Sequence, residues 1–312
     1  MSYVPLFWSS SGEVTADNKT YLYLDPSKLL AKAPYLWDPT VGMGTVTHQT
    51  IGYLWPLGPY YWVMDRLGAP DWVAERLWLG TLLFAAGAGV LFLWRTIERR
   101  RPVWPAMTVA AFAYLLTPYV LDYAARISVI LMPWAALPWL IGFAARSVRG
   151  PTWRWPALFA LTVVTVGGVN ATALLLAGLG PLVWIVWAVW GSRETTGRRA
   201  LAGAGRIALL TGVTSAWWIA GLLLQGQYGI PILRYTETYE AVARTSSPAE
   251  ILRGLGYWFF YGGDKVDPWV GASHTYLTEL WLVVLGYGLV AAALVALAAV
   301  RFRHRGFAAA LL

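Results

Sequence analysis

Seven long uncharged runs constrain the fold of this chain more than any other feature of its sequence. A helix needs about 20 apolar residues to cross the hydrocarbon of a bilayer, and each single run is close to that length. The runs cover residues 77–94, 103–121, 127–145, 155–190 (counted twice), 207–224 and 280–300. The doubled run is broken at Gly167-Gly168-Val169-Asn170, which predicts a tight helical hairpin. The sequence therefore predicts an all-α polytopic membrane protein with about seven spans.

The composition supports this fold class. The 312 residues are 58% hydrophobic and 13% charged, whereas soluble domains carry about a quarter charged residues. The chain has no cysteine, which excludes disulfides and catalysis by a thiolate. Its net charge of +8 does not indicate nucleic-acid binding, because no basic face with interleaved aromatic residues is present.

Arginines gather in alternate breaks between the runs, where only Glu98 and Glu194 oppose them. Positive residues in short loops mark the cytoplasmic side, so the net charge of +8 divides into about +12 inside and −4 outside. The inner arginines are Arg95, Arg99, Arg100, Arg101, Arg146, Arg149, Arg154, Arg193, Arg198, Arg199, Arg206, Arg301, Arg303 and Arg305. We therefore expect a multi-pass plasma-membrane protein with two structured loops and an active site on the extracytoplasmic side.

This topology divides the chain into four segments. They are a first extracytoplasmic loop (1–71), transmembrane helices (72–224), a second extracytoplasmic loop (225–279), and a final helix with a basic loop and the start of a further span (280–312). Residues 1–16 hold neither a span nor a signal sequence, although the topology places Asp17 outside. We therefore expect that a helix before the first loop is missing and that the chain is a fragment.

The first loop carries signals for local structure. Asp25 followed by Pro26 predicts a short helix over about 26–32. Asp38 before a proline predicts a turn. We expect Asp71 to cap the first long helix, which carries Glu75 near the positive end of its dipole.

The second loop has a possible helix start at Ser247-Pro248-Ala249-Glu250, which fits a capping box. The helix would place several apolar residues on one face, as in a helix that lies in the membrane interface. These residues are Ile251, Leu252, Leu255, Trp258 and Phe259.

Asp17 is the candidate catalytic residue. It lies just before Lys19, where the missing helix would reach the outer membrane boundary. A carboxylate there can accept a proton from an incoming hydroxyl, while Lys19 or an arginine neutralises a phosphate. The local sequence by itself leaves open that Asp17 is a solvated loop aspartate.

Two arginines, Arg126 and Arg234, lie on the outer side at membrane ends. They either snorkel to the interface or bind a lipid phosphate. The 20 tryptophans mostly suit an interfacial belt, although aromatic residues of the two loops, Trp55 among them, could also stack on sugar rings. The candidate substrate-binding residues are Lys19, Trp37, Asp38, His48, Tyr53, Arg126, Arg234, Tyr235, Glu237 and Trp258.

No metal site or cofactor is expected. The histidines at 48, 274 and 304 are too dispersed to indicate a metal site, and no phosphate-binding loop or nucleotide fingerprint is present. Metal dependence stays open.

Particular strings resemble the D-type α-(1→3)-arabinofuranosyltransferases of actinobacterial cell walls, which are GT-C class membrane glycosyltransferases. They are S-V-I-L-M-P-W-A-A-L-P-W-L (128–140), T-V-G-G-V-N-A-T-A (165–173), G-I-P-I-L-R-Y-T-E-T-Y-E (229–240) and L-R-G-L-G-Y-W-F-F-Y-G (252–262), with L-W-D-P (36–39) and Y-L-W-P-L-G-P (53–59). The resemblance covers nearly the whole chain.

The resemblance implies a GT-C-like transmembrane bundle and transfer of D-arabinofuranose from decaprenyl-phosphoryl-arabinose to a 3-hydroxyl of α-(1→5) arabinan, in arabinogalactan and lipoarabinomannan. It also implies that Asp17 is the base, that a lipid-linked sugar is the co-substrate, and that an acyl carrier protein binds the cytoplasmic face.

Two alternatives remain at this point. A transporter or flippase of a polyprenyl-linked glycan would show ionisable residues in its spans or an internal repeat, and the uncharged runs show neither. A non-catalytic scaffold for cell-wall assembly could recruit an acidic carrier protein through the arginine-rich breaks.

Overall fold

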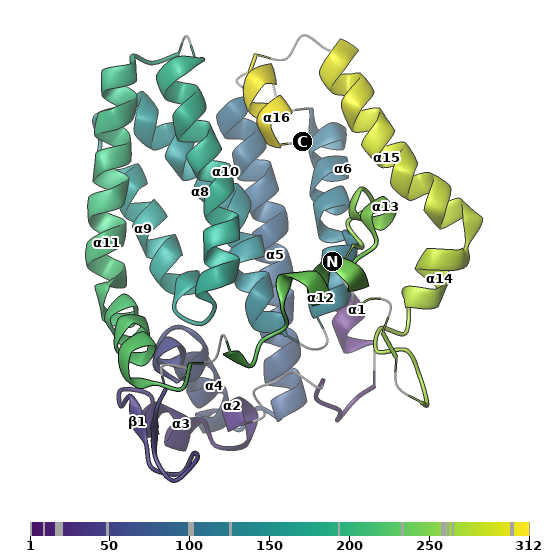
Figure 1. Cartoon of the computed structure of the whole chain (residues 1–312). Coiled ribbons are helices and arrows are strands. Elements are labelled where there is room, and N and C mark those ends of the chain that lie inside the picture. The colour runs from purple at the N-terminus through teal and green to yellow at the C-terminus, as the bar shows by residue number, and fades with distance from the viewer. Residues whose placement is uncertain are drawn as a thin grey trace. The chain divides into compact units, whose positions relative to one another are not determined.

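The computed structural model describes residues 2–8, 10–15, 21–47, 50–98, 103–124, 127–192, 194–231, 234–256, 260, 262–263, 265–299 and 303–311. It divides into two compact units (Figure 1). Unit 1 consists of Met1–Leu115 and Arg126–Pro231, and unit 2 of Leu116–Ala125 and Ile232–Leu312.

Unit 1 is a helical bundle built around α8 (Leu131–Arg149), which packs against α5 (Asp71–Ile97), α9 (Arg154–Gly167), α10 (Ala171–Trp190) and α11 (Gly197–Tyr228). Small residues allow these close approaches. A Cβ atom on Gly203 would lie 2.6 Å from the carbonyl oxygen of Ser147, and one on Gly180 would lie 2.9 Å from the side chain of Ile141. Packing through small residues is typical of membrane helices, where the lipid supplies no hydrophobic drive between them.

Five helical segments in the described part of the chain are long and apolar enough to cross a membrane. They are Asp71–Ile97, Ser128–Arg149 (which includes the 3-10 turn η2, Ser128–Ile130), Ala171–Trp190, Gly197–Tyr228 and Leu280–Ala299. Two shorter apolar helices are α6 (Trp104–Leu115) and α9. The all-α membrane fold is confirmed, whereas the total of about seven spans stays a prediction.

Two of the apolar runs, 155–190 and 103–121, are each divided into two helices. The hairpin in the doubled run is confirmed, because α9 ends at Gly167 and α10 begins at Ala171, with the Asn170 side chain accepting a hydrogen bond from Ala173 N at 2.9 Å. The run over 103–121 is interrupted near Pro118. In that run α6 ends at Leu115 and α7 (Pro118–Tyr123) begins at a proline, which disfavours helix in the residue before it.

The first loop, residues 21–70 in the structure, forms short elements at one end of unit 1 (Figure 1). They are α2 (Tyr21–Leu24), α3 (Pro26–Lys32), the antiparallel pair β1 (Trp37–Asp38) and β2 (Thr45–Val46), the 3-10 turn η1 (Ile51–Leu54) and α4 (Leu57–Arg66). The predicted helix over 26–32 is confirmed, with the Asp25 carboxylate accepting a hydrogen bond from Lys28 N at 2.8 Å. The predicted Asp71 cap is wrong, because the cap residue is Pro70 and Asp71 is already in the first turn of α5.

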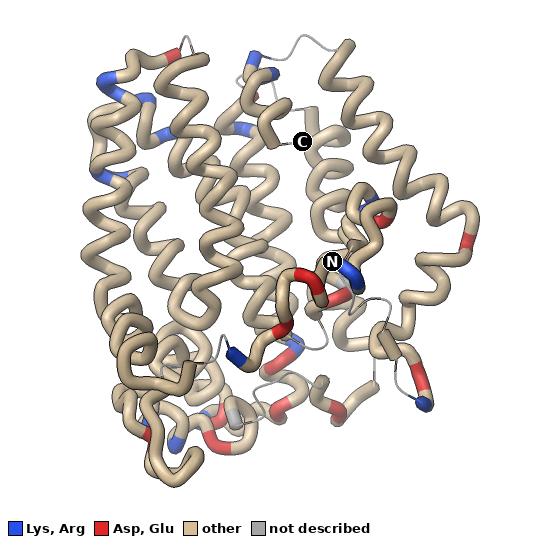
Figure 2. Tube along the Cα trace, viewed as in Figure 1, with Lys and Arg blue, Asp and Glu red and all other residues tan. Residues whose placement is uncertain are grey.

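Many Lys and Arg positions of unit 1 lie along the chain at the opposite end of the bundle from the first loop (Figure 2). This basic end comprises the C-terminal ends of α5 and α8 and the N-terminal ends of α9 and α11. The described part of unit 1 therefore carries the charge asymmetry that the sequence predicted.

Unit 2 contains α7, α12 (Tyr239–Thr245), α13 (Pro248–Ile251), α14 (Ser273–Thr278), α15 (Leu280–Ala299) and α16 (Arg305–Leu311). The second loop has a small core of Leu255, Phe260 and Val270. The predicted capping box is wrong: the Ser247 side chain makes no capping bond, and the Glu250 carboxylate instead pairs with Arg253 at 2.6 Å. The helix therefore ends after one turn rather than continuing as an interfacial helix.

Candidate functional site

The first loop is built directly onto the ends of three bundle helices. A Cβ atom on Gly52 would overlap the carbonyl oxygen of Gly168, so the backbone of η1 lies against the α9–α10 turn. Trp55 Nε1 donates a hydrogen bond to Thr165 Oγ1 at 3.2 Å. A Cβ atom on Gly221 of α11 would lie 3.2 Å from Ile51. The loop therefore forms a fixed platform on the bundle.

Both flanks of residues 16–20, which lie outside the described residues and include Asp17 and Lys19, are anchored near the start of α5. On one side, Thr15 N donates to Glu75 Oε2 at 3.1 Å. On the other, the Tyr23 ring packs edge-on against Tyr61, with centroids 5.0 Å apart. Tyr61 neighbours Tyr60, whose hydroxyl donates to Ala74 O of α5 at 2.8 Å.

Three of the predicted binding residues lie in this platform. Asp38 acts in the predicted turn, because its carboxylate accepts hydrogen bonds from the backbone and hydroxyl of Thr40, which lower its pKa. Trp37 is 58% exposed and its ring covers Gly44. Tyr53 is fully buried, so its ring has no face open to a sugar, and that expectation is wrong.

The other predicted residues divide into two groups. Arg234, Tyr235 and Glu237 are exposed residues of unit 2, and Tyr235 is 78% exposed. The remaining candidates lie outside the described residues: Asp17, Lys19, His48, Arg126 and Trp258. A shared site formed by Asp17 with Lys19, Arg126, Arg234 and Glu237 therefore stays a prediction.

Asp122 is a candidate that the sequence reasoning passed over. It lies in α7 of unit 2, is only 3% exposed, and its Oδ1 has no hydrogen-bond partner among the described residues. Burial raises its pKa to about 7. Burial and then the Asp122 charge raise the pKa of Tyr119 to about 12. A carboxylate of this kind can exchange protons near neutral pH, as functional carboxylates often do. The available signal was a lone acidic residue in a very short connection between apolar runs.

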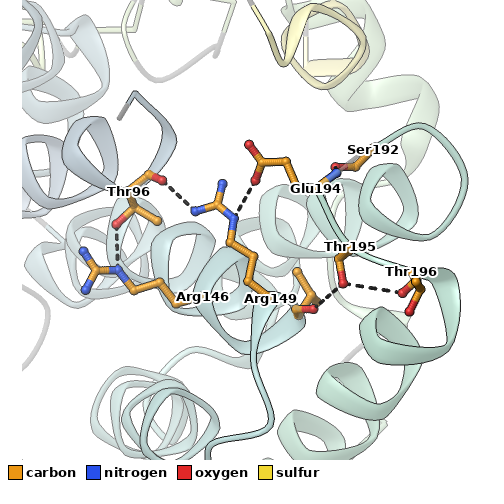
Figure 3. Close-up of polar contacts among 8 residues, drawn as sticks. Thr96, Arg146, Arg149, Ser192, Glu194, Thr195 and Thr196 are labelled. Carbon is orange, nitrogen blue, oxygen red and sulfur yellow. Dashed lines mark hydrogen bonds and ion pairs between the residues drawn. The ribbon is translucent and has the colours of Figure 1, made fainter. Parts of the chain in front are cut away.

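Arginines of the basic end bind backbone carbonyls at helix ends (Figure 3). Arg149 Nη1 donates to Thr96 O at 2.7 Å, Arg146 Nε donates to Thr96 Oγ1 at 3.0 Å, and Arg149 Nε pairs with Glu194 Oε2 at 2.7 Å. Thr195 Oγ1 donates to Val148 O at 3.0 Å. The C-terminal ends of α5 and α8 are thus satisfied by cations and hydroxyls, as expected for negative dipole ends. This cluster stabilises the bundle and has no catalytic geometry.

No group of three or more histidine or acidic residues that could hold a metal ion occurs in the described part of the chain. His274 is exposed in α14, whereas His304 is buried at 1% exposure.

A family model described as alpha-(1->3)-arabinofuranosyltransferase, N-terminal GT-C domain, matches residues 2–312. An alpha-(1->3)-arabinofuranosyltransferase of Mycobacterium tuberculosis is 32% identical over 260 residues, which cover 81% of this chain and 18% of that protein. An alpha-(1->3)-arabinofuranosyltransferase of Mycolicibacterium smegmatis is 30% identical over 310 residues, which cover 96% of this chain and 20% of that protein.

Solved structures show the same similarity. A cryo-EM structure of arabinofuranosyltransferase AftD from Mycobacteria matches with a TM-score of 0.78 and 26% identity, over 98% of this chain and 21% of that one. A structure of a mutant of the same enzyme matches with a TM-score of 0.79 and 26% identity. This match covers 100% of this chain and 22% of the other. The chain therefore spans about a fifth of the length of these relatives.

Proposed function

Because the chain belongs to the alpha-(1->3)-arabinofuranosyltransferase, N-terminal GT-C domain family, we propose that it forms the membrane core of an enzyme that transfers D-arabinofuranose. The donor is decaprenyl-phosphoryl-arabinose, and the acceptor is a 3-hydroxyl of α-(1→5) arabinan in the cell wall. The core lies in the plasma membrane with its active site on the extracytoplasmic side.

Asp17 is the general base of this reaction. It accepts the proton of the acceptor hydroxyl, which then attacks the sugar while the lipid phosphate leaves. The observation that carries this proposal is that both flanks of the 16–20 segment are held on α4 and α5, through Thr15 on Glu75 and Tyr23 on Tyr61. A catalytic group gains reactivity when neighbouring residues orient it, and Thr15 and Tyr23 are the held residues on either side of this segment.

The remaining chemistry is recognition. Lys19, Arg126 and Arg234 neutralise the phosphate at the membrane interface. Exposed aromatic rings, Trp37 and Tyr235, stack on sugar rings, and Asp38, His48, Glu237 and Trp258 supply hydrogen bonds. Exclusion of water favours transfer over hydrolysis. Neither a nucleotide nor a cofactor takes part, since the donor already carries its leaving group.

The basic end suits an acidic acyl carrier protein. Most arginines there are engaged in internal contacts, but Arg198 and Arg199, in the first turn of α11, are exposed. Exposed cations of this kind attract an acidic partner through long-range electrostatics.

The test is Asp17→Asn in the full-length protein, with arabinose transfer from the lipid-linked donor as the readout. We expect turnover to fall by about a hundredfold or more, within the range for loss of a general base. The matched control is Asp25→Asn, since asparagine caps a helix as well as aspartate and this variant should transfer normally. Normal turnover by folded Asp17→Asn would exclude Asp17 as the base. Lipid flipping in vesicles without any sugar transfer would favour a flippase.

A further inference from the structure

Two adjacent charged residues in the first turns of α5, Glu75 and Arg76, are each only 7% exposed. Charged side chains are rarely buried unless partners compensate for the lost hydration. Both side chains make hydrogen bonds to one segment far away in sequence, residues 6–15. We call residues 2–15 the N-terminal strap.

Arg76 binds the strap through three backbone carbonyls. Its Nη1 donates to Leu6 O at 2.7 Å, and its Nη2 donates to Ser10 O and Glu13 O at 3.0 Å each. Its guanidinium also lies 5.7 Å from the centroid of the Trp72 ring. The planar fork of an arginine can hold several carbonyls at once, which a lysine cannot do with the same geometry.

Glu75 binds the last described residue of the strap. Thr15 N donates to both carboxylate oxygens, at 3.2 and 3.1 Å, and Thr15 Oγ1 donates to Glu75 Oε1 as well. Hydrogen bonds to a charged acceptor are about twice as strong as neutral ones. Thr15 lies two residues before Asp17.

Contacts near the start of the strap are of a different kind. The Tyr3 ring occupies the space that a Cβ atom on Gly80 would need, and its hydroxyl bonds Thr81 Oγ1 at 3.1 Å. The Phe7 ring packs edge-on against Trp72 at 6.0 Å. The strap is therefore held on α5 by aromatic packing at its start and by the buried charges of Glu75 and Arg76 towards its end.

Glu75 is also close to the other flank of the 16–20 segment. Burial, then Tyr23 and then Glu75 raise the pKa of Tyr61, and Tyr23 is the residue that packs on Tyr61. The charge of Glu75 therefore acts on Tyr61, the residue against which Tyr23 of the other flank packs.

We propose that Glu75 and Arg76 are positioning residues that hold the end of the N-terminal strap so that Asp17 meets the acceptor hydroxyl. This inference rests on the proposed role of Asp17. The physical reason is that a catalytic group displaced by about 1 Å loses on the order of a hundredfold in rate.

The first test is Glu75→Gln in the full-length protein. A glutamine has one acceptor oxygen and no charge, so it cannot replace the paired bonds to Thr15. We expect kcat to fall by about 10- to 100-fold while KM for the lipid-linked donor changes by less than about threefold, because two of the three proposed phosphate-binding residues, Arg126 and Arg234, lie outside the 16–20 segment. The matched control is Tyr3→Phe, which removes the hydrogen bond to Thr81 at the start of the strap and should keep kcat near that of the wild type.

Thr15→Val provides a variant that does not disturb the buried helix. It removes the hydroxyl donor but keeps the backbone donor, so a smaller loss in kcat of about 3- to 10-fold is expected. Thr15→Ser keeps both donors and should restore kcat. Equal activity of the Val and Ser variants at the wild-type level would contradict the proposal.

Two further readouts separate positioning from general stability. Hydrogen exchange of peptides covering residues 10–24 should become faster in Glu75→Gln, while peptides of α8 and α10 stay protected. In an Asp17→Asn background, Glu75→Gln should lower the residual rate no further. An equal additional loss there, or unchanged exchange and kcat, would overturn the inference.

The proposed base can fail separately. If Asp17→Asn by itself keeps wild-type turnover, Asp17 is not the base. A lower kcat with faster exchange over 10–24 in Glu75→Gln would still support positioning of this segment for another group.

Discussion

The two loops differ in how they are held. Each is tied down by one arginine that is 7% exposed, Arg76 for the strap beside the first loop and Arg253 in the second loop. Arg253 pairs with Glu250 at 2.6 Å, donates to Tyr276 O at 2.6 Å and lies 5.8 Å from the centroid of the Tyr287 ring. In addition to these arginine contacts, the backbone of the first loop at Gly52 packs against the backbone of the bundle at Gly168.

The second loop leaves more of its chemistry exposed. Tyr235 and Tyr239 are 78% and 83% exposed, and Arg234 and Glu237 are exposed too. A buried contact requires a fixed backbone, whereas an exposed side chain can still reorganise around a ligand. The first loop is therefore fixed on its bundle, whereas the second loop leaves these charged and aromatic side chains open to solvent.

The strongest test of this contrast is a pair of glycine substitutions. Gly52→Ala places a methyl group where the Gly168 carbonyl oxygen lies, so we expect the protein to lose about 3 kcal/mol or more of stability, at the upper end for overpacking. Gly271→Ala in the second loop meets no atom within 4 Å and should change stability by less than about 0.5 kcal/mol. Thermal unfolding in detergent measures both, and equal melting temperatures would refute the platform.

A second test compares how two carboxylates, Asp122 and Asp38, make the stability of the protein depend on pH. The folded protein raises the pKa of Asp122 to about 7 from 3.8, so the folded state holds this proton more tightly than the unfolded chain. Stability from this group is fully present below about pH 4 and is lost as pH rises to about 7. Asp122→Asn should remove this loss and raise stability at pH 8 by about 2 to 4 kcal/mol. Unfolding measured from pH 4 to 8 tests this prediction, and an unchanged slope in the variant would contradict a raised pKa of Asp122.

A third test concerns adaptation of the second loop. Arg234→Gln removes an exposed cation, and we expect KM for the lipid-linked donor to rise by about tenfold, a loss of about 1.4 kcal/mol. The melting temperature should not change, because the side chain is exposed. Arg244→Gln, in the exposed face of α12, is the matched control. A similar rise in KM for both variants would indicate a general charge effect rather than binding by Arg234.

The smallest effect is expected at Asp38. Hydrogen bonds from Thr40 lower its pKa, so its contribution to stability is present above its unfolded pKa and is lost as pH falls through the folded value. Asp38→Asn should therefore cost well under about 1 kcal/mol at pH 7, because the group is largely open to solvent, and the cost should shrink as pH falls below 3.8. This sign is opposite to that of Asp122, and the same pH series tests both.

Local sequence patterns predicted the elements whose formation depends on neighbouring residues. The helix behind Asp25 and the break before Ala171 follow from capping and turn preferences over a few residues, and the structure confirms both. The cap at Asp71 was wrong, because the cap residue of α5 is Pro70. Ser247 is the cap residue of α13 and has the extended backbone that caps adopt, but its side chain makes no capping bond.

The sequence by itself was enough to identify a helical membrane protein and its charge asymmetry. Its sequence motifs also indicated the family. Only the tertiary structure decided that Tyr53 is buried, that Gly52 meets Gly168, and that Glu75 binds Thr15 across 60 residues. The physical reason is the separation along the sequence over which each interaction acts. Hydropathy and helix hydrogen bonds act within a few residues, whereas side-chain contacts between distant segments depend on how whole helices pack.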